Sequence, residues 1–133
     1  MSVYVIHSFD GIYGGLCGME MWSLEELPDI ATAKDVAKEM SRAIIESYSE
    51  ITDILYERAE DYVYWDMDEG RITSQAQRDN AFHSYYDTCA NDDIAYCIVK
   101  LDPSYTIKQY NEMLTNREYD YEELADTFGV EEY

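Results

Sequence analysis

The sequence predicts an α+β fold, with a small sheet of two to four strands packed against a long amphipathic helix and several shorter helices. Short runs of β-branched and aromatic residues at 3–8, 19–24 and 94–101 have the composition of strands. Between the last two runs, apolar residues recur at intervals of three and four for about seven helical turns. The chain has 133 residues and no internal repeat or linker, so we expect a single acidic domain over 1–133.

The three strand-like runs have different expected places in the sheet. Residues 3–8, VYVIHS, predict a first strand, and the glycine-rich stretch 11–18, GIYGGLCG, predicts a loop after it. Residues 19–24, MEMWSL, alternate apolar and polar side chains, which favours an edge strand. Residues 94–101, IAYCIVKL, form an apolar run too short for a core helix, so we expect a central strand there.

The long helix is predicted to start near Thr32, because Thr32 and Asp35 resemble a capping box, and to end at Gly70 with a break near Tyr64. We expect it to run to at least Leu55, with the middle of its apolar stripe buried against the strand at 94–101. The stripe consists of eight residues: Ala37, Met40, Ile44, Tyr48, Ile51, Leu55, Ala59 and Tyr62.

Three further helices are predicted after the long one. Residues 73–90 form the first, and two short helices follow near 105–115 and 120–128. Gly129 stands directly after the last helix, in the position of a C-cap. The expected buried residues of the helix at 73–90 are alanines and aromatic residues: Ala76, Ala81, Phe82, Tyr85 and Tyr86.

Acidic residues recur along the long helix on the side opposite its apolar stripe. Glu50, Asp53 and Glu57 follow the same interval of three and four, about half a turn away from the stripe. Successive carboxylates there stand about 5 to 6 Å apart along the axis, a spacing similar to that of phosphates on one nucleic-acid strand. We name this row the acidic ridge and predict it as the partner-binding site; its members are Glu46, Glu50, Asp53, Glu57, Glu60, Asp61, Tyr64, Asp66, Asp68 and Glu69.

The whole chain carries a large negative charge. Its 29 acidic and 9 basic residues give a formal net charge of -20, well beyond the charge of about 2 to 8 that keeps a small domain soluble. Such a charge repels DNA, RNA and anionic lipid and attracts a basic protein. We therefore expect a basic protein partner, no direct nucleic-acid binding and no membrane association. A solvated outer helix face and a halophilic origin are the alternatives that need no partner.

Tyrosine is unusually frequent beside these acids. The chain has 14 Tyr and 3 Phe, whereas a core alone would favour Phe. Tyr and Trp supply rigid, amphipathic contact area and are enriched at interface hot spots. Acids interleaved with tyrosines therefore favour a surface that meets a basic groove.

Three motifs with metal-binding or phosphate-binding potential are incomplete. In 66–70, DMDEG, the glycine stands at the fifth position of a calcium loop instead of the sixth. The cysteines and histidines match no zinc spacing, and GIYGGLCG lacks the Lys-Ser or Lys-Thr of a phosphate loop. We therefore predict no metal, no cofactor and no catalytic residue, so the protein is not expected to be an enzyme. An enzyme that uses clustered carboxylates with a divalent metal is the alternative.

The expected compartment follows from cysteine usage and from the N-terminus. Cys17, Cys89 and Cys97 form no CxxC pair, which indicates reduced thiols. The first residues lack the basic and apolar regions of a signal peptide, and no apolar run is long enough to span a membrane. We expect the protein in the cytoplasm, in the host-cell cytoplasm if a phage encodes it.

In size, charge and the combination of acids with aromatic residues, the chain resembles the small acidic inhibitors encoded by phages and mobile elements. These are the anti-restriction and anti-CRISPR proteins that act as DNA mimics. The resemblance implies a non-enzymatic inhibitor that occupies the basic nucleic-acid-binding groove of a host defence nuclease. The alternative is an immunity protein, antitoxin or secretion chaperone that neutralises a basic toxin or effector. A monomer and a dimer are both compatible with these functions.

Overall fold

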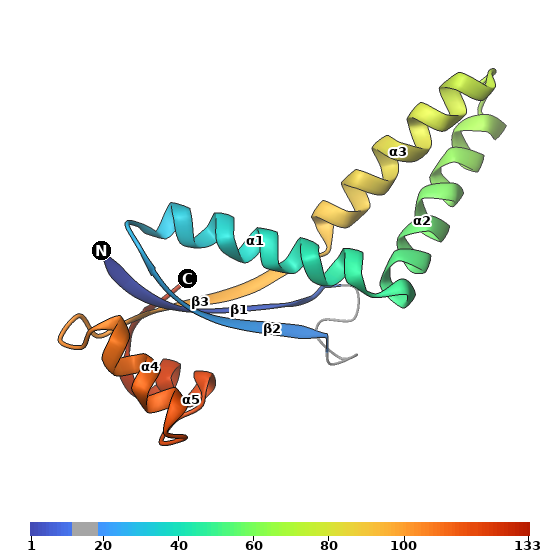
Figure 1. Cartoon of the computed structure of the whole chain (residues 1–133). Coiled ribbons are helices and arrows are strands. Elements are labelled where there is room, and N and C mark those ends of the chain that lie inside the picture. Colours follow the sequence, from blue (N-terminus) through green and yellow to red (C-terminus); the bar gives the residue numbers. More distant parts are fainter. Residues whose placement is uncertain (12–18) are drawn as a thin grey trace.

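The computed structural model of the chain describes residues 1–11 and 19–133, which form the α+β fold that the sequence predicts (Figure 1). Within them, four antiparallel strands make one sheet in the order β2-β1-β3-β4. The strands are β1 (Ser2–Asp10), β2 (Glu20–Leu27), β3 (Ile94–Leu101) and β4 (Gly129–Glu132). The helices are α1 (Ile30–Ser47), α2 (Ser49–Asp68), α3 (Gln75–Asp92), α4 (Ile107–Thr115) and α5 (Tyr121–Phe128). Apart from Gly11, the predicted loop at 11–18, which includes Cys17, lies outside the described residues.

The helices lie in three places around the sheet. α1 covers one face of the sheet, and α4 and α5 cover the other face (Figure 1). α2 and α3 pack on each other as a helical hairpin that projects beyond the end of the sheet (Figure 1). We name α2, α3 and the turn between them the helical arm.

β1 lies inside the sheet and is buried on both faces, which explains its uninterrupted apolar sequence. Tyr4 and Ile6 pack in the cluster formed with α1, and Val3 and Val5 pack in the cluster formed with α4 and α5. β2 is an edge strand and β3 an interior strand, as the sequence predicts.

α1 begins two residues before its predicted start. Asp29 is the N-cap, and its carboxylate accepts a hydrogen bond from the Thr32 backbone N–H at 2.8 Å. The predicted capping box at Thr32 is therefore wrong. Thr32 lies inside the first turn of α1, and its own backbone N–H is capped by Asp29.

The predicted long helix is in fact two helices. Tyr48 has the extended backbone angles φ -113 and ψ 115 and separates α1 from α2, so the break lies there and not near Tyr64. The helix does not continue to Leu55, and Tyr48 is 41% exposed where burial was predicted. The apolar spacing hides this break, because Ile44 and Ile51 are seven residues apart, as on two turns of one helix. Both are buried in the same cluster.

The helical arm buries a narrower strip than the predicted stripe. Tyr62 is 54% exposed, and its neighbour Val63 is buried instead. Near the tip α3 is the element that covers α2, so a single line of contact replaces the broad face that a sheet would cover (Figure 1). For the same reason Ala76, close to the tip on α3, is exposed against the prediction. Five further residues that the sequence predicts to be buried in these helices are half-buried: Met40, Ala81, Phe82, Tyr85 and Tyr86.

β4 was not predicted from the sequence. Gly129 does follow α5 as its C-cap, but it is extended and opens β4, which pairs with β3. A Cβ atom at Gly129 would lie 2.3 Å from the carbonyl oxygen of Ala125 and 2.7 Å from a methyl group of Val99, so only glycine fits there. The strand escaped prediction because its residues, GVEE, are all exposed and show no apolar alternation.

No helix within the described ranges has the length and apolar character that crossing a membrane requires.

Candidate protein-interaction surface

The central part of the acidic ridge occupies the outer face of α2. Ile51 and Leu55 are buried with residues of α1 and α3, whereas Glu50 is exposed, so the predicted register of α2 is confirmed. Tyr64 lies on the same outer face and is 49% exposed. Six carboxylates of the ridge are exposed on this helix: Glu50, Asp53, Glu57, Glu60, Asp61 and Asp68.

These six carboxylates have no cationic partner within residues 1–11 and 19–133, where none of them forms an ion pair or a hydrogen bond. Arg58, the one basic residue of α2, contacts Asp93 instead, with its Nη1 3.5 Å from Oδ2. Like charges one turn apart destabilise a helix by a few tenths of a kcal/mol per pair. Beyond Glu50, which lies in the first turn and is favoured there by the helix dipole, the row is thus a repulsive charge pattern within the helix.

Two other predicted members of the ridge have basic partners at its ends. Glu46 belongs to α1, beyond the break, and accepts a hydrogen bond from Arg42 Nε at 2.9 Å. This hydrogen bond raises the pKa of the Arg42 guanidinium. Glu69 is the C-cap of α2 and pairs with Arg71. Within the acidic ridge, the acids without a basic partner in the described residues are thus the six exposed ones between Glu50 and Asp68.

Asp66 is buried, with 8% of its surface exposed, and is not part of an exposed ridge. It accepts hydrogen bonds from Arg71 Nη1 at 3.1 Å and from the Tyr85 hydroxyl. The hydrogen bond between Tyr85 and Asp66 is the main cause that raises the pKa of Tyr85, and burial is the second cause. The prediction for Asp66 is corrected because α3 closes over this side of α2, so the carboxylate joins the two helices of the arm.

The tip of the helical arm is a tight, ordered turn. Gly70 has φ 75, a left-handed conformation that glycine adopts without strain. The N–H of Gly70 donates to the carbonyl of Met67 at 3.1 Å, and the N–H of Arg71 donates to that of Asp66 at 2.9 Å. These two bonds form a Schellman motif, which ends α2 and turns the chain into α3.

Aromatic rings border the ridge along both sides of α2. On one side, Tyr56 contacts Phe82 and Tyr86 of α3, with ring centroids 5.3 Å and 5.1 Å apart. On the other side, Tyr62 stacks on Tyr85 at 5.1 Å. The arm therefore presents carboxylates flanked by amphipathic rings, the residue types that dominate energetic anchors in protein interfaces.

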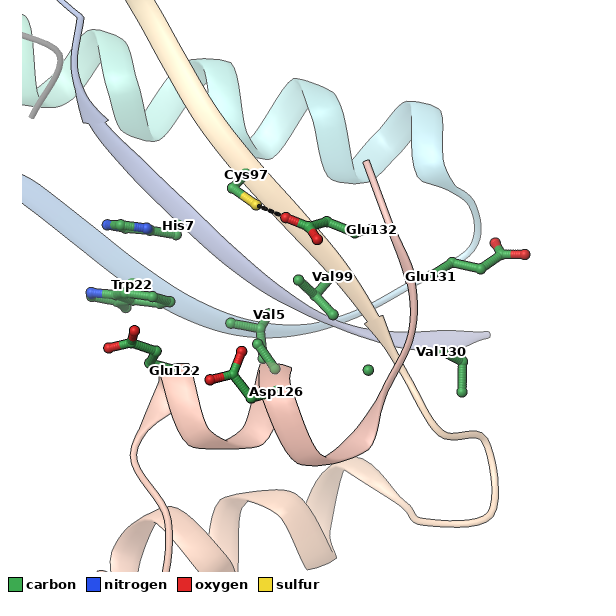
Figure 2. A pocket seen from close by; sticks show the side chains of 12 residues that line it. Val5, His7, Trp22, Cys97, Val99, Glu122, Asp126, Val130, Glu131 and Glu132 are labelled. Atoms are coloured by element: carbon green, nitrogen blue, oxygen red, sulfur yellow. Dashed lines mark hydrogen bonds between the residues drawn. The ribbon is translucent and has the colours of Figure 1, made fainter.

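A second candidate site, which sequence analysis missed, is a cleft of about 380 Å³ between the sheet, α5 and β4 (Figure 2). Val5 and Val99 contribute apolar side chains to it, and His7 stacks on Trp22 at a centroid distance of 3.7 Å. His7 Nε2 lies 2.7 Å from a carboxylate oxygen of Glu20. The acidic side chains in the lining are Glu122, Asp126, Glu131 and Glu132. Prediction of this cleft would have required prediction of β4.

Cys97 lies in this cleft opposite His7 in the β1–β3 register, the arrangement of a potential thiol–imidazole pair. Its thiol donates to Glu132 Oε1 at 3.1 Å instead of to His7 (Figure 2). Burial, and then this hydrogen bond, raise the pKa of Cys97 to about 11. The thiol is therefore protonated at neutral pH, whereas a nucleophilic cysteine needs a lowered pKa.

The residues considered for metal binding do not come together. Cys89 is in the core with Ile44 and Ile51, whereas Cys97 lines the cleft. Residues 66–70 form the C-terminal end of α2 and the turn after it, and the Asp66 carboxylate accepts hydrogen bonds from Arg71 and Tyr85. In the described part of the chain, no three His, Cys, Asp or Glu side chains are grouped to hold a metal ion.

Fold and surface together define a class: a strongly acidic α+β protein with a projecting helical arm whose outer face carries uncompensated carboxylates. Comparison with known proteins finds no matching protein-family model, no matching curated protein and no matching solved structure.

Proposed function

We propose that the protein is a non-enzymatic inhibitor that places its helical arm in the basic nucleic-acid-binding groove of a host defence nuclease, of the anti-CRISPR or anti-restriction type. The observation that carries the proposal is the row of six exposed carboxylates on α2 without a cationic partner in the described residues. A groove lined with Lys and Arg would neutralise this row, as it neutralises phosphates.

The position of the ridge supports the same function. A charged helix that lies flat against the rest of the protein could contact only a flat partner surface. The helical arm projects from the sheet, so it has the shape to enter a groove (Figure 1). The Schellman turn at its tip and the hydrogen bonds of Asp66 hold the two helices together. A preorganised arm loses little conformational entropy when it enters a groove.

The second candidate function is neutralisation of a basic toxin or effector by an immunity protein, antitoxin or secretion chaperone. The rings beside the ridge favour it, because aromatic anchors serve recognition of any protein surface and not of a nucleic-acid-binding groove alone. Competition separates the two functions: a mimic excludes nucleic acid from its partner, whereas a neutralising protein need not.

The test is capture of the partner followed by competition with DNA. The immobilised protein is exposed to a lysate of the cells in which it acts, and bound proteins are eluted with duplex DNA or guide RNA. We expect to capture a basic nuclease that nucleic acid displaces from the immobilised protein. We also expect the acidic protein, added free in solution, to inhibit cleavage of DNA by that nuclease. A captured protein that binds no nucleic acid, or that DNA does not displace, would contradict the proposal and favour the second function.

A further inference from the structure

The indole of Trp65 is an exposed ring on the helical arm. Trp65 is 64% exposed, and among the described residues only Met1 is a more exposed large hydrophobic residue. Five of the ten exposed large hydrophobic residues of the described chain lie on α2: Tyr56, Tyr62, Tyr64, Trp65 and Met67. The stretch with the uncompensated carboxylates therefore also carries half of the exposed large hydrophobic residues of the described structure.

Along α2, Trp65 stands between two acidic residues of the ridge. Asp61 precedes it by four residues and Asp68 follows it by three, so all three side chains share one face of α2. Both carboxylates are exposed and have no ion pair within the described ranges. The neighbouring Tyr62 is held in place by its stack on Tyr85, whose hydroxyl is bonded to Asp66.

The arm already contains an arginine placed over an aromatic ring. The guanidinium carbon of Arg78 lies 5.6 Å from the centroid of Tyr64. One aromatic residue of α2, Tyr64, therefore has a guanidinium over the face of its ring. Trp65 has no such contact within residues 1–11 and 19–133, although Trp is the strongest cation–π acceptor of the three aromatic residue types.

The geometry points to an arginine-binding site at the end of the arm, in which the guanidinium of a basic protein partner lies against Trp65 and pairs with Asp61 or Asp68. This inference rests on the proposed function and identifies one contact of the partner. Arginine fits better than lysine, because its planar group stacks on rings and is more weakly hydrated. A second copy of the chain does not fit, because pairing two arms through Trp65 would bring two acidic ridges together.

Such a contact would give the interface a fixed register. Carboxylates in a row attract any positive surface, and a partner could slide along them at little energetic cost. A ring that receives one guanidinium fixes one arginine of the partner at one point of the arm.

The test measures binding of two fluorescein-labelled peptides, nona-arginine and nona-lysine, by fluorescence anisotropy at low ionic strength. The variants are Trp65→Phe, which keeps a ring, Trp65→Leu, which keeps apolar area without a ring, and Trp65→Ala. Tyr133→Leu is the matched control, because Tyr133 is also exposed and near acids but lies off the arm. Circular dichroism verifies that each variant is folded, as expected for a side chain that is 64% exposed.

We expect Trp65→Leu and Trp65→Ala to weaken nona-arginine binding about three- to five-fold, and Trp65→Phe to weaken it less. Binding of nona-lysine should change less than about two-fold. The inference is overturned if Trp65→Leu binds nona-arginine as wild type does, or if both peptides lose affinity equally. It is also overturned if light scattering shows a dimer of the wild type that Trp65→Leu abolishes.

The proposed function fails separately in the same assay. If the triple variant Glu50→Lys, Asp53→Lys, Glu57→Lys binds both peptides as wild type does, the ridge does not bind positive charge, whatever Trp65 does. If the triple variant loses affinity and Trp65→Leu does not, the ridge is supported and the arginine site is not.

Discussion

At the scale of single residues, Asp66 differs from the other acids of α2 because its carboxylate is used inside the protein. We predict that Asp66→Ala lowers the free energy of unfolding by about 1.5 to 3 kcal/mol, since it removes charged hydrogen bonds from Arg71 and Tyr85. Urea denaturation measures this. Asp68→Ala, two residues away and exposed, is the matched control and should change stability by less than about 0.5 kcal/mol. Equal effects of the two substitutions would show that the Asp66 hydrogen bonds do not stabilise the arm.

Asp93 predicts a dependence of stability on pH. The pKa of Asp93 is raised, and burial of its carboxyl group is the largest cause. The positive charge of Arg58 lowers this pKa in part, and the negative charge of Asp10 raises it further. The folded protein therefore holds the proton more tightly than the unfolded chain, so ionisation of Asp93 costs stability as the pH rises through the folded-state pKa. The cost is absent below the unfolded-state pKa of about 3.9.

We therefore predict that Asp93→Asn stabilises the protein at pH 7 and that the gain shrinks as the pH approaches 4. Urea midpoints of wild type and variant across this range measure the difference. Loss of the contact with Arg58 should matter little, because half of the Arg58 side chain is exposed. A wild type that is more stable than the variant at pH 7 would contradict the argument.

At the scale of elements, β4 depends on a single glycine. Because a Cβ atom at Gly129 would lie 2.3 Å from the Ala125 carbonyl oxygen, we predict that Gly129→Ala lowers stability by about 1 to 3 kcal/mol. The same substitution should release β4, so that hydrogen exchange at the Tyr133 amide, which bonds to the Ile98 carbonyl at 2.8 Å, becomes faster. Unchanged exchange at Tyr133 would mean that β4 does not need the close approach at Gly129.

The spacing of apolar residues in the sequence predicted correctly those elements whose apolar residues are buried at a regular interval. It misled where the chain changes direction or where a strand is fully exposed. β1, β3 and the register of α2 follow directly from their apolar residues, because residues of these apolar patterns are the ones that pack in the core clusters. The break at Tyr48 kept the helical spacing intact and was invisible. The exposed β4 and the cleft beside it have no apolar signature, so both were missed. Burial of Asp66 depends on Tyr85 and Arg71, which no local pattern links to it.

At the scale of the whole molecule, the charge of -20 predicts strong salt dependence of partner binding. Affinity for the captured partner should fall steeply between about 50 and 200 mM salt, because screening weakens both steering and contact energy. Isothermal titration calorimetry at several salt concentrations measures the slope. An affinity that is indifferent to salt would indicate a mainly apolar interface, in which the rings of the arm and not its carboxylates bind the partner.

The most direct test of the acidic ridge compares two charge-matched triple variants. Glu50→Lys, Asp53→Lys, Glu57→Lys reverses the ridge, and Asp35→Lys, Glu39→Lys, Glu112→Lys reverses three exposed acids on the body. Affinity for the captured partner is measured for both at one salt concentration. We predict a loss on the order of 2 to 3 kcal/mol, about 30- to 150-fold, for the ridge variant and near wild-type affinity for the body variant. Equal losses would mean that only total charge matters, and no loss in either would contradict a role of the ridge in binding.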